Sequence, residues 1–149
     1  MIESDKIKLA SQQLASLSTE AINELLKDMA NALEAGAEEI LVANERDLSR
    51  MDSSDPKYDR LRLTHERISA IASDCRNVAS LPSPLGRILS QRTMPNGLEI
   101  SRVTVPFGVI GVIYEARPNV TLDVTALCLK AGSAVILQGG SDAEESNKA

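Results

Sequence analysis

The last third of the sequence alternates between strand and helix signals, and this alternation restricts the fold class more than any other feature. A run rich in β-branched residues, 107–114, predicts a strand buried on both faces, and 134–138 predicts a second short strand. Between them, Pro118 is well placed to begin a helix that runs to about Lys130. Strand, helix and strand with short connections are typical of a right-handed parallel βαβ unit, which indicates the α/β class.

The helix of this unit is expected to turn an apolar face inward and to end at a glycine. The residues predicted to face inward are Val120, Val124, Leu127 and Ala131. Gly132 is predicted to be the C′ residue. After the second strand, Gly139 and Gly140 predict a turn, and the Ser-x-x-Glu pattern at Ser141 and Glu144 predicts a capping box that opens another helix.

Two parallel strands are too few for an independently stable layered sheet. We therefore expect residues 106–149 to be the first part of a larger parallel sheet that continues beyond this chain. The alternative is a complete small domain that pairs its strands with another subunit.

Residues 1–85 are predicted to be a helical segment. Apolar residues recur at three- and four-residue spacing over 22–33, which is the stripe of an amphipathic helix, and Gly36 is its expected stop. A second helix is predicted around 38–47, and a weaker helical pattern covers 7–17.

A surface loop is predicted over 51–57, and another helix follows Thr64. Pro82 and Pro84 are expected to end this helix. Its apolar residues are in phase at Ile68, Ile71, Ala72, Cys75, Val78 and Ala79.

An Asn-Gly pair at residues 96–97 lies between two extended runs, 88–93 and 98–105. This pair is a strong signal for a β-hairpin, which we predict over 87–105. Apolar and polar residues alternate imperfectly in the second run, which indicates one face exposed to water.

Composition excludes several classes of function. The chain has 21 Asp and Glu against 16 Lys and Arg, and its formal charge is −5. A sequence-independent nucleic-acid binder needs clustered basic residues, and base stacking needs aromatic residues, which are only 2% here. The longest run without a charge, 103–114, is far below the roughly 20 apolar residues that span a bilayer. Neither nucleic acid nor membrane is an expected partner.

The cysteines and the N-terminus indicate a cytoplasmic protein. The first residues lack a basic region followed by an apolar one, so no secretory signal is expected. Two cysteines do not make a disulfide framework, and with one histidine they fall short of a zinc site.

Arg117 and Asn119 are candidates for ligand contact because they lie between a strand and a helix. In open α/β sheets, ligands bind at the carboxyl ends of the strands, and a guanidinium there can hold a carboxylate or phosphate. Alternatively, Arg117 caps a carbonyl or pairs with Glu115. Asn119 could donate to an oxyanion or tie down the loop.

The turn at Gly139, Gly140 and Ser141 is a second candidate, because helix N-termini bind anions. Acidic residues in the next turn would repel a phosphate, however, so a tight strand-to-helix turn is the alternative.

The remaining reactive side chains offer no nucleophile. Cys75 and Cys128 lie on inward or flanking helix positions and are expected to be unreactive core residues. His65 is expected to be solvated at a helix start.

Residues 106–120 closely resemble the segment by which γ-glutamyl phosphate reductases, also called glutamate-5-semialdehyde dehydrogenases, are known. The specific part is Glu-Ala-Arg-Pro-Asn-Val at 115–120. Shorter matches continue the likeness in one register at 43–47, 59–68, 81–86, 96–98 and 127–141.

The resemblance implies an outlying branch of the aldehyde dehydrogenase superfamily, which reduces γ-glutamyl phosphate with NADPH to glutamate 5-semialdehyde in the second step of proline synthesis. It implies a Rossmann-like cofactor domain, a catalytic domain with a cysteine nucleophile, and a projecting hairpin for oligomerisation. Homo-oligomers and association with glutamate 5-kinase are the implied protein partners.

Family members are longer than this chain. The resemblance therefore implies that residues 1–149 are the N-terminal part of the NADP-binding domain, without the catalytic domain. Neither Cys75 nor Cys128 matches the catalytic cysteine.

The resemblance also assigns site residues. The superfamily's oxyanion-hole asparagine falls at Arg117, with Asn119 two positions later, so either is an expected substrate contact. Gln138 takes the place of a lysine that touches the adenosine ribose, and Ser141 the place of an acidic residue that favours NAD. Together with Gly139 and Gly140 they are the expected NADP contacts.

The leading hypothesis is an N-terminal piece of a γ-glutamyl phosphate reductase that is inactive alone. The alternatives are an interaction module that pairs with a full-length reductase or with glutamate 5-kinase, and a cofactor-binding module.

Overall fold

Helices make up most of the described chain up to residue 80, and two of them begin at a residue whose side chain caps the helix. In the computed structural model, which describes residues 4–115 and 117–149, they are α1 (Ser4–Ala15), α2 (Thr19–Ala35), α3 (Ala37–Leu48), α4 (Tyr58–Leu61) and α5 (His65–Ser80). The side chains of Ser18 and Thr64 accept the N–H groups of Ala21 and Arg67 at the starts of α2 and α5. The predicted helices are confirmed, and α4 is an addition.

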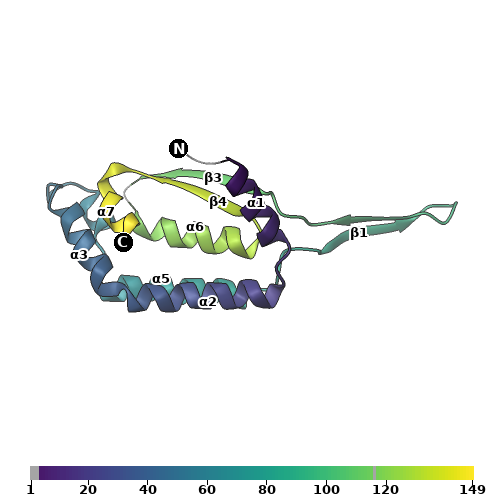
Figure 1. Ribbon diagram of the computed structural model, residues 1–149, viewed down its shortest axis with the longest axis horizontal. Coiled ribbons are helices and arrows are strands. Elements are labelled where there is room, and N and C mark those ends of the chain that lie inside the picture. The colour runs from purple at the N-terminus through teal and green to yellow at the C-terminus, as the bar shows by residue number, and fades with distance from the viewer. Residues whose placement is uncertain (1–3, 116) are drawn as a thin grey trace.

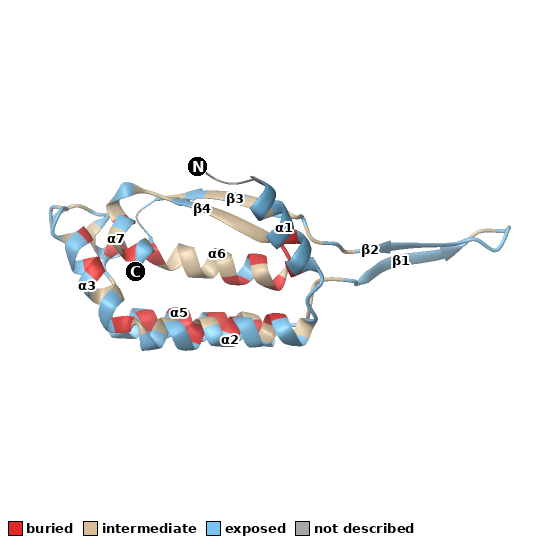
Figure 2. Ribbon diagram, in the orientation of Figure 1, coloured by how far each residue is buried: buried red, intermediate tan, exposed pale blue. Residues whose placement is uncertain are grey.

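The core lies where α2, α5 and α6 (Pro118–Lys130) meet. Figure 2 shows buried residues concentrated along these facing helix surfaces. The fully or nearly fully buried members are Ile22, Leu26, Ala30, Ala72, Cys75, Ala79 and Ala126. The apolar stripes expected for α2 and α5 therefore form the main packing contact.

Two parallel strands confirm the predicted βαβ unit. β3 (Val109–Tyr114) pairs with β4 (Ala134–Gly139), from Val109 opposite Ala134 to Tyr114 opposite Gly139. In Figure 1, α6 lies between this sheet and the α2–α5 layer, while α1 packs against the strands.

The prediction that β3 is buried on both faces is wrong. Exposed and half-buried residues alternate along it, and the Ile113 side chain is 86% exposed. Within the described ranges the sheet has two strands, and α6 packs against it from one side only.

The inward face predicted for α6 is also partly wrong. Leu127 is 55% exposed, while Ala126, Cys128 and Lys130 are buried. Apolar residues surround this helix because it packs against both a sheet and α5, so their spacing does not single out one face. The two ends are as predicted, since Pro118 is in the first turn and Gly132 has a φ of +64° just after the C-cap.

The hairpin prediction is confirmed, with β1 (Ile88–Thr93) antiparallel to β2 (Glu99–Val103) and Gly97 at a φ of +84° in the turn. However, both faces are exposed rather than one, because the ribbon projects away from the body (Figures 1 and 2). Its exposed apolar residues are Ile88, Leu89, Leu98, Ile100 and Val103.

The predicted capping box is wrong. After β4 the chain forms a short 3-10 turn, η1 (Ser141–Ala143), before α7 (Glu144–Lys148), and the Ser141 side chain makes no cap hydrogen bond. In the described part of the chain, no helix is long and apolar enough to cross a membrane.

Candidate functional site

The βαβ unit brings the two groups of candidate residues to one edge of the sheet. Tyr114 and Gly139 are paired in register at the ends of β3 and β4. Arg117 follows the first strand, and Gln138 and Ser141 lie at the end of the second. Since ligands of open α/β sheets bind at such an edge, the placement agrees with both expectations.

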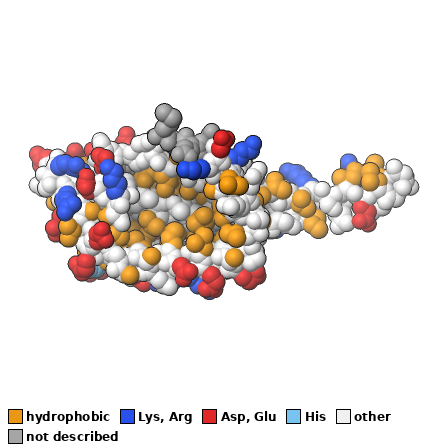
Figure 3. Space-filling view, in the orientation of Figure 1, with side chains coloured by type: hydrophobic (Ala, Val, Ile, Leu, Met, Phe, Trp, Pro, Cys, Tyr) orange, Lys and Arg blue, Asp and Glu red, His pale blue; other side chains and the backbone are white. Residues whose placement is uncertain are grey.

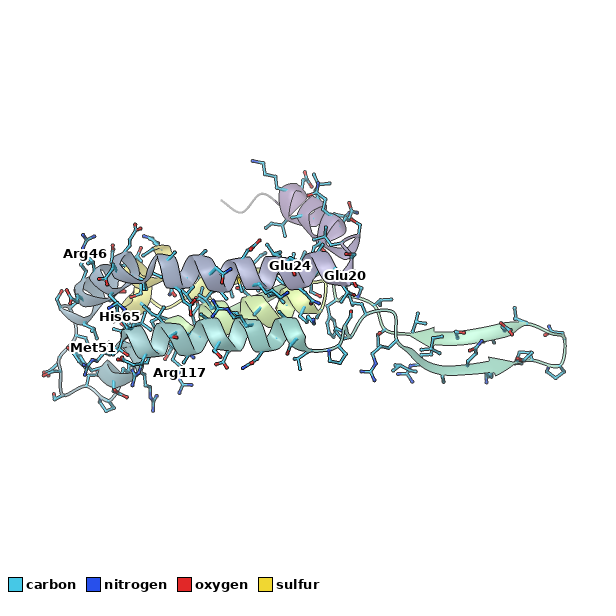
Figure 4. The ribbon with its side chains drawn as sticks, turned by 90° about the horizontal axis from the view of Figure 1, so that it is seen from below. Glu20, Glu24, Arg46, Met51, His65 and Arg117 are labelled. Atoms are coloured by element: carbon cyan, nitrogen blue, oxygen red, sulfur yellow. The ribbon has the colours of Figure 1, made fainter. Side chains whose placement is uncertain are left out.

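Arg117 lines a cleft of about 350 Å³ between α6 and the segment that leads into α5. In Figure 4 it lies beside the first half of α5, at the end of the molecule that also holds Met51 and His65. Asn119 lines the same cleft. The charged residues that join them there are Asp59, Arg60, Arg62, Arg67, Asp74 and Asp123.

Arg117 is available for a ligand. It is the N-cap residue of α6, and its side chain is exposed. Across residues 4–115 and 117–149, its guanidinium makes no hydrogen bond and no ion pair, so neither a carbonyl nor Glu115 holds it. The two structural alternatives for Arg117 therefore find no support in this geometry.

Asn119 is held within its own helix. Its Nδ2 atom donates to Asp123 Oδ2 at 3.1 Å. Burial raises the pKa of Asp123; the Asn119 hydrogen bond opposes that rise and the like charge of Asp74 adds to it. The hydrogen bond from Asn119 thus stabilises the ionised form of Asp123 in the cleft.

Arg67 organises the opposite wall. Its Nη2 atom lies 3.0 Å from Asp59 Oδ1, and its Nη1 atom donates to the carbonyl of Arg62 at 2.6 Å and also to that of Asp59. These bonds fix the chain around α4, so that Arg60 and Arg62 line the cleft.

The six further charged residues of the cleft were not predicted from spacing, because α5 and α6 approach only in the folded chain. Asp59, Arg60 and Arg67 lie in the family-like stretch 59–68, which was the available signal for them. No comparable signal marks Asp74 or Asp123.

The second candidate group is a tightly packed turn. A Cβ atom on Gly139 would lie 2.7 Å from Asn147 Nδ2 and 3.1 Å from Tyr114 Oη. Both neighbours belong to a chain of hydrogen bonds in which Thr121 Oγ1 is 2.6 Å from Tyr114 Oη and donates to Asn147 Oδ1 at 2.7 Å. A side chain at position 139 would therefore displace Asn147 or Tyr114 from these hydrogen bonds.

The N-terminus of α7 is already occupied by a carboxylate of the protein, that of Asp47. The Asp47 carboxylate, which is buried, accepts the N–H groups of Glu145 and Ser146 at 3.1 and 2.8 Å. This arrangement leaves no free anion site on α7. Gln138 and Ser141 are exposed beside it, and Asp142 lies 3.5 Å from Lys57 Nζ.

Both cysteines are buried thiols, as expected. Cys75 is 1% and Cys128 7% exposed, and burial raises the pKa of each thiol. His65 is exposed at the start of α5, with Nε2 3.3 Å from Glu38 Oε1. Among the described residues, no group of three His, Cys, Asp or Glu could hold a metal ion.

Sequence comparison gives one consistent result. No protein-family model matches the chain. The γ-glutamyl phosphate reductases of Bacteroides thetaiotaomicron and Chlorobium phaeobacteroides are 59% and 58% identical to it, over 96% and 97% of its length. The chain spans about a third of these curated relatives, 34% and 35% respectively.

Solved structures agree. The γ-glutamyl phosphate reductase of Thermotoga maritima superposes with a TM-score of 0.92 at 39% identity, covering 97% of this chain and 36% of that one. The yeast enzyme, from Saccharomyces cerevisiae, gives 0.89 at 32% identity, over 98% of this chain and 39% of that one. An NAD-dependent benzaldehyde dehydrogenase from Corynebacterium glutamicum gives 0.73 at 25% identity, over 96% of this chain and 29% of that one.

In sequence and in fold, the chain therefore corresponds to the N-terminal third of the γ-glutamyl phosphate reductases, within the aldehyde dehydrogenase superfamily.

Proposed function

We propose that the chain supplies the N-terminal part of a γ-glutamyl phosphate reductase. The reaction is the reduction of γ-glutamyl 5-phosphate by NADPH to glutamate 5-semialdehyde, with release of phosphate. The observation that carries this proposal is 59% identity to such a reductase over 96% of the chain. The chain is proposed to be the front of the NADP-binding domain, with helices over 1–85, the hairpin 87–105 and the βαβ start 106–149.

The proposed substrate contacts are Arg117 and Asn119. The unpaired guanidinium of Arg117 offers a bidentate site for the phosphate or carboxylate of the substrate. The amide of Asn119 already donates one hydrogen bond to Asp123, whereas the guanidinium of Arg117 has no protein partner among the described residues, so Arg117 is the stronger assignment.

The nucleophile is proposed to lie outside this chain. A reductase of this superfamily uses a thiolate, whereas the two thiols here are buried and their pKa values are raised. Arg117 and its neighbours then bind and orient the acyl phosphate without taking part in bond formation.

The proposed cofactor contacts are Gln138, Gly139, Gly140 and Ser141. The cofactor, when bound, supplies the hydride. Gln138 and Ser141 are exposed at the carboxyl end of β4 and fit a ribose, which needs hydrogen bonds. Ser141 brings no charge against a 2′-phosphate, and this supports NADPH over NADH. Because Asp47 occupies the start of α7, we assign no phosphate contact to that helix.

The hairpin is proposed to mediate assembly. Apolar residues on both exposed faces, and strand edges free to pair, favour a protein partner, either a second copy or glutamate 5-kinase. An interaction module without catalysis remains the second candidate, because it needs only this surface.

A chimera tests the proposal. Residues 1–149 would replace the matching third of the Bacteroides thetaiotaomicron reductase, and NADPH oxidation with γ-glutamyl phosphate would be followed at 340 nm, the absorbance band of reduced nicotinamide. We expect activity from the chimera and none from the chain alone. A folded but inactive chimera would favour the interaction module. Turnover by the chain alone, lost on replacing Cys75 or Cys128, would show that the nucleophile was misassigned.

A further inference from the structure

A groove between α5 and α6 continues the cleft that Arg117 lines, and the character of its lining changes along its length. Two adjoining cavities share Asp74 and Asp123. On one side of this pair, near the starts of both helices, the lining includes Arg117 and Arg67, and Arg67 is already paired with Asp59. On the other side it becomes largely apolar towards Leu127.

The two carboxylates lie well apart from the guanidinium end. Asp74 is seven residues beyond Arg67 on α5, and Asp123 is six beyond Arg117, which corresponds to about 9–11 Å along the helix axes. Within the described ranges, neither carboxylate forms an ion pair. Among the described residues, the groove therefore presents two carboxylates without a cationic partner and, nearer the helix starts, the unpaired guanidinium of Arg117.

Asp123 is the more enclosed carboxylate. It is half-buried, and its side-chain hydrogen bond comes from the neutral amide of Asn119 at 3.1 Å. The loss of water on burial raises its pKa, and the like charge of Asp74 adds to this, so the ionised pair is electrostatically unfavourable without a cation. A primary ammonium group between the two would offset this repulsion and could donate to both.

We propose that Asp74 and Asp123 bind the α-ammonium group of an amino-acid ligand whose anionic groups lie against Arg117 and the neighbouring arginines. The groove then distinguishes an α-amino acid from the same acid without its amino group. This inference rests on the proposed function of the cleft and assigns its specificity to two residues outside the reacting centre.

A matched pair of ligands tests it on the full 149-residue chain. L-2-amino-5-phosphonopentanoate carries the ammonium, carboxylate and phosphonate groups, and 5-phosphonopentanoate lacks only the ammonium. Titration calorimetry and amide chemical shifts would report both affinities. We expect the amino compound to bind about tenfold or more tightly. Asp123→Asn should abolish most of that difference while leaving the affinity for 5-phosphonopentanoate nearly unchanged.

Controls separate this inference from the proposed function. Asp28→Asn, on the exposed side of α2, should leave the ratio of affinities unchanged, and Asp74→Asn should lower it like Asp123→Asn. Equal binding of both compounds, lost in Arg117→Ala, would overturn the ammonium site and leave the anion site standing. No binding of either compound at millimolar concentration would overturn both.

Discussion

The carboxylate of Asp47 accepts hydrogen bonds from both the backbone N–H and the hydroxyl of Ser146, at 2.8 and 2.6 Å. Asp47 is 1% exposed on α3, and Ser146 lies 99 residues later in α7. Arg50 Nη2 contacts the same carboxylate. A side chain from a distant helix therefore provides the N-terminal cap that the local sequence of α7 does not.

Replacing Asp47 should be costly for this reason. Asp47→Ala leaves the N–H groups of Glu145 and Ser146 without their acceptor, and we expect a loss of about 2–4 kcal/mol in the free energy of unfolding. Urea denaturation followed by circular dichroism measures it. The exposed Glu45→Ala on the same helix should change stability by less than about 0.5 kcal/mol. Equal losses from the two variants would contradict the capping role.

Two glycines of the sheet should respond differently to alanine. At Gly139 the added Cβ meets Asn147 and Tyr114, and relieving the 2.7 Å contact with Asn147 breaks its bond with Thr121. We expect Gly139→Ala to lower stability by about 1–3 kcal/mol. At Gly111 a Cβ meets nothing within 4 Å, so Gly111→Ala should be nearly neutral. Thermal unfolding of both variants tests this difference in stability. Similar melting temperatures would show that the turn at Gly139 accommodates the added methyl group.

The two thiols should be slow to react in the native chain. Burial raises the pKa of Cys75 and of Cys128, so the thiolate fraction at pH 8 is below that of an ordinary cysteine, and the sulfur atoms are also shielded. We expect iodoacetamide to modify neither thiol until denaturant is added, when both react. Mass spectrometry after timed quenching counts the modified cysteines. Rapid labelling of one cysteine in the folded chain would identify an accessible thiol instead.

Asp123 should make stability depend on pH. Its pKa is raised in the folded state, so the folded chain binds the proton more tightly than the unfolded chain does. Stability from this group is therefore highest below the unfolded pKa and falls as pH rises through the folded one. Asp123→Asn, which keeps a partner for Asn119, should raise the urea midpoint at pH 7 relative to wild type.

That gain from Asp123→Asn should disappear at acidic pH, where the wild-type carboxyl is protonated in both states. The surface variant Asp28→Asn serves as the control, with no comparable pH-dependent gain expected. A gain that persists unchanged at low pH would show that desolvated charge is not its cause.

Local signals predicted most elements because their causes are local. Thr64 caps α5, Pro118 begins α6, and Gly97 adopts the positive φ that its hairpin turn requires. The exposure of the Ile113 and Leu127 side chains could not be predicted in the same way, because it depends on which neighbours cover β3 and α6. The apolar character of both segments is consistent with several packing arrangements.

The residues of the candidate site show the same difference between local signals and tertiary contacts. Arg117 and Asn119 were predicted from a strand-to-helix junction and from family resemblance, and the structure brings them into one cleft. Asp74 and Asp123 gave no sequence signal, since an aspartate on a helix is usually solvated and only the approach of α5 to α6 makes these two neighbours.

By itself, the sequence determined the order of helices and strands, the hairpin turn and the kinship with γ-glutamyl phosphate reductases, because propensity, capping and turn chemistry act over a few residues. Tertiary structure alone decided that Asp47 caps α7 and that Asp74 and Asp123 line one cleft with Arg117. Those relationships join residues many positions apart, and their energies arise from burial and charge proximity that exist only once the chain has folded.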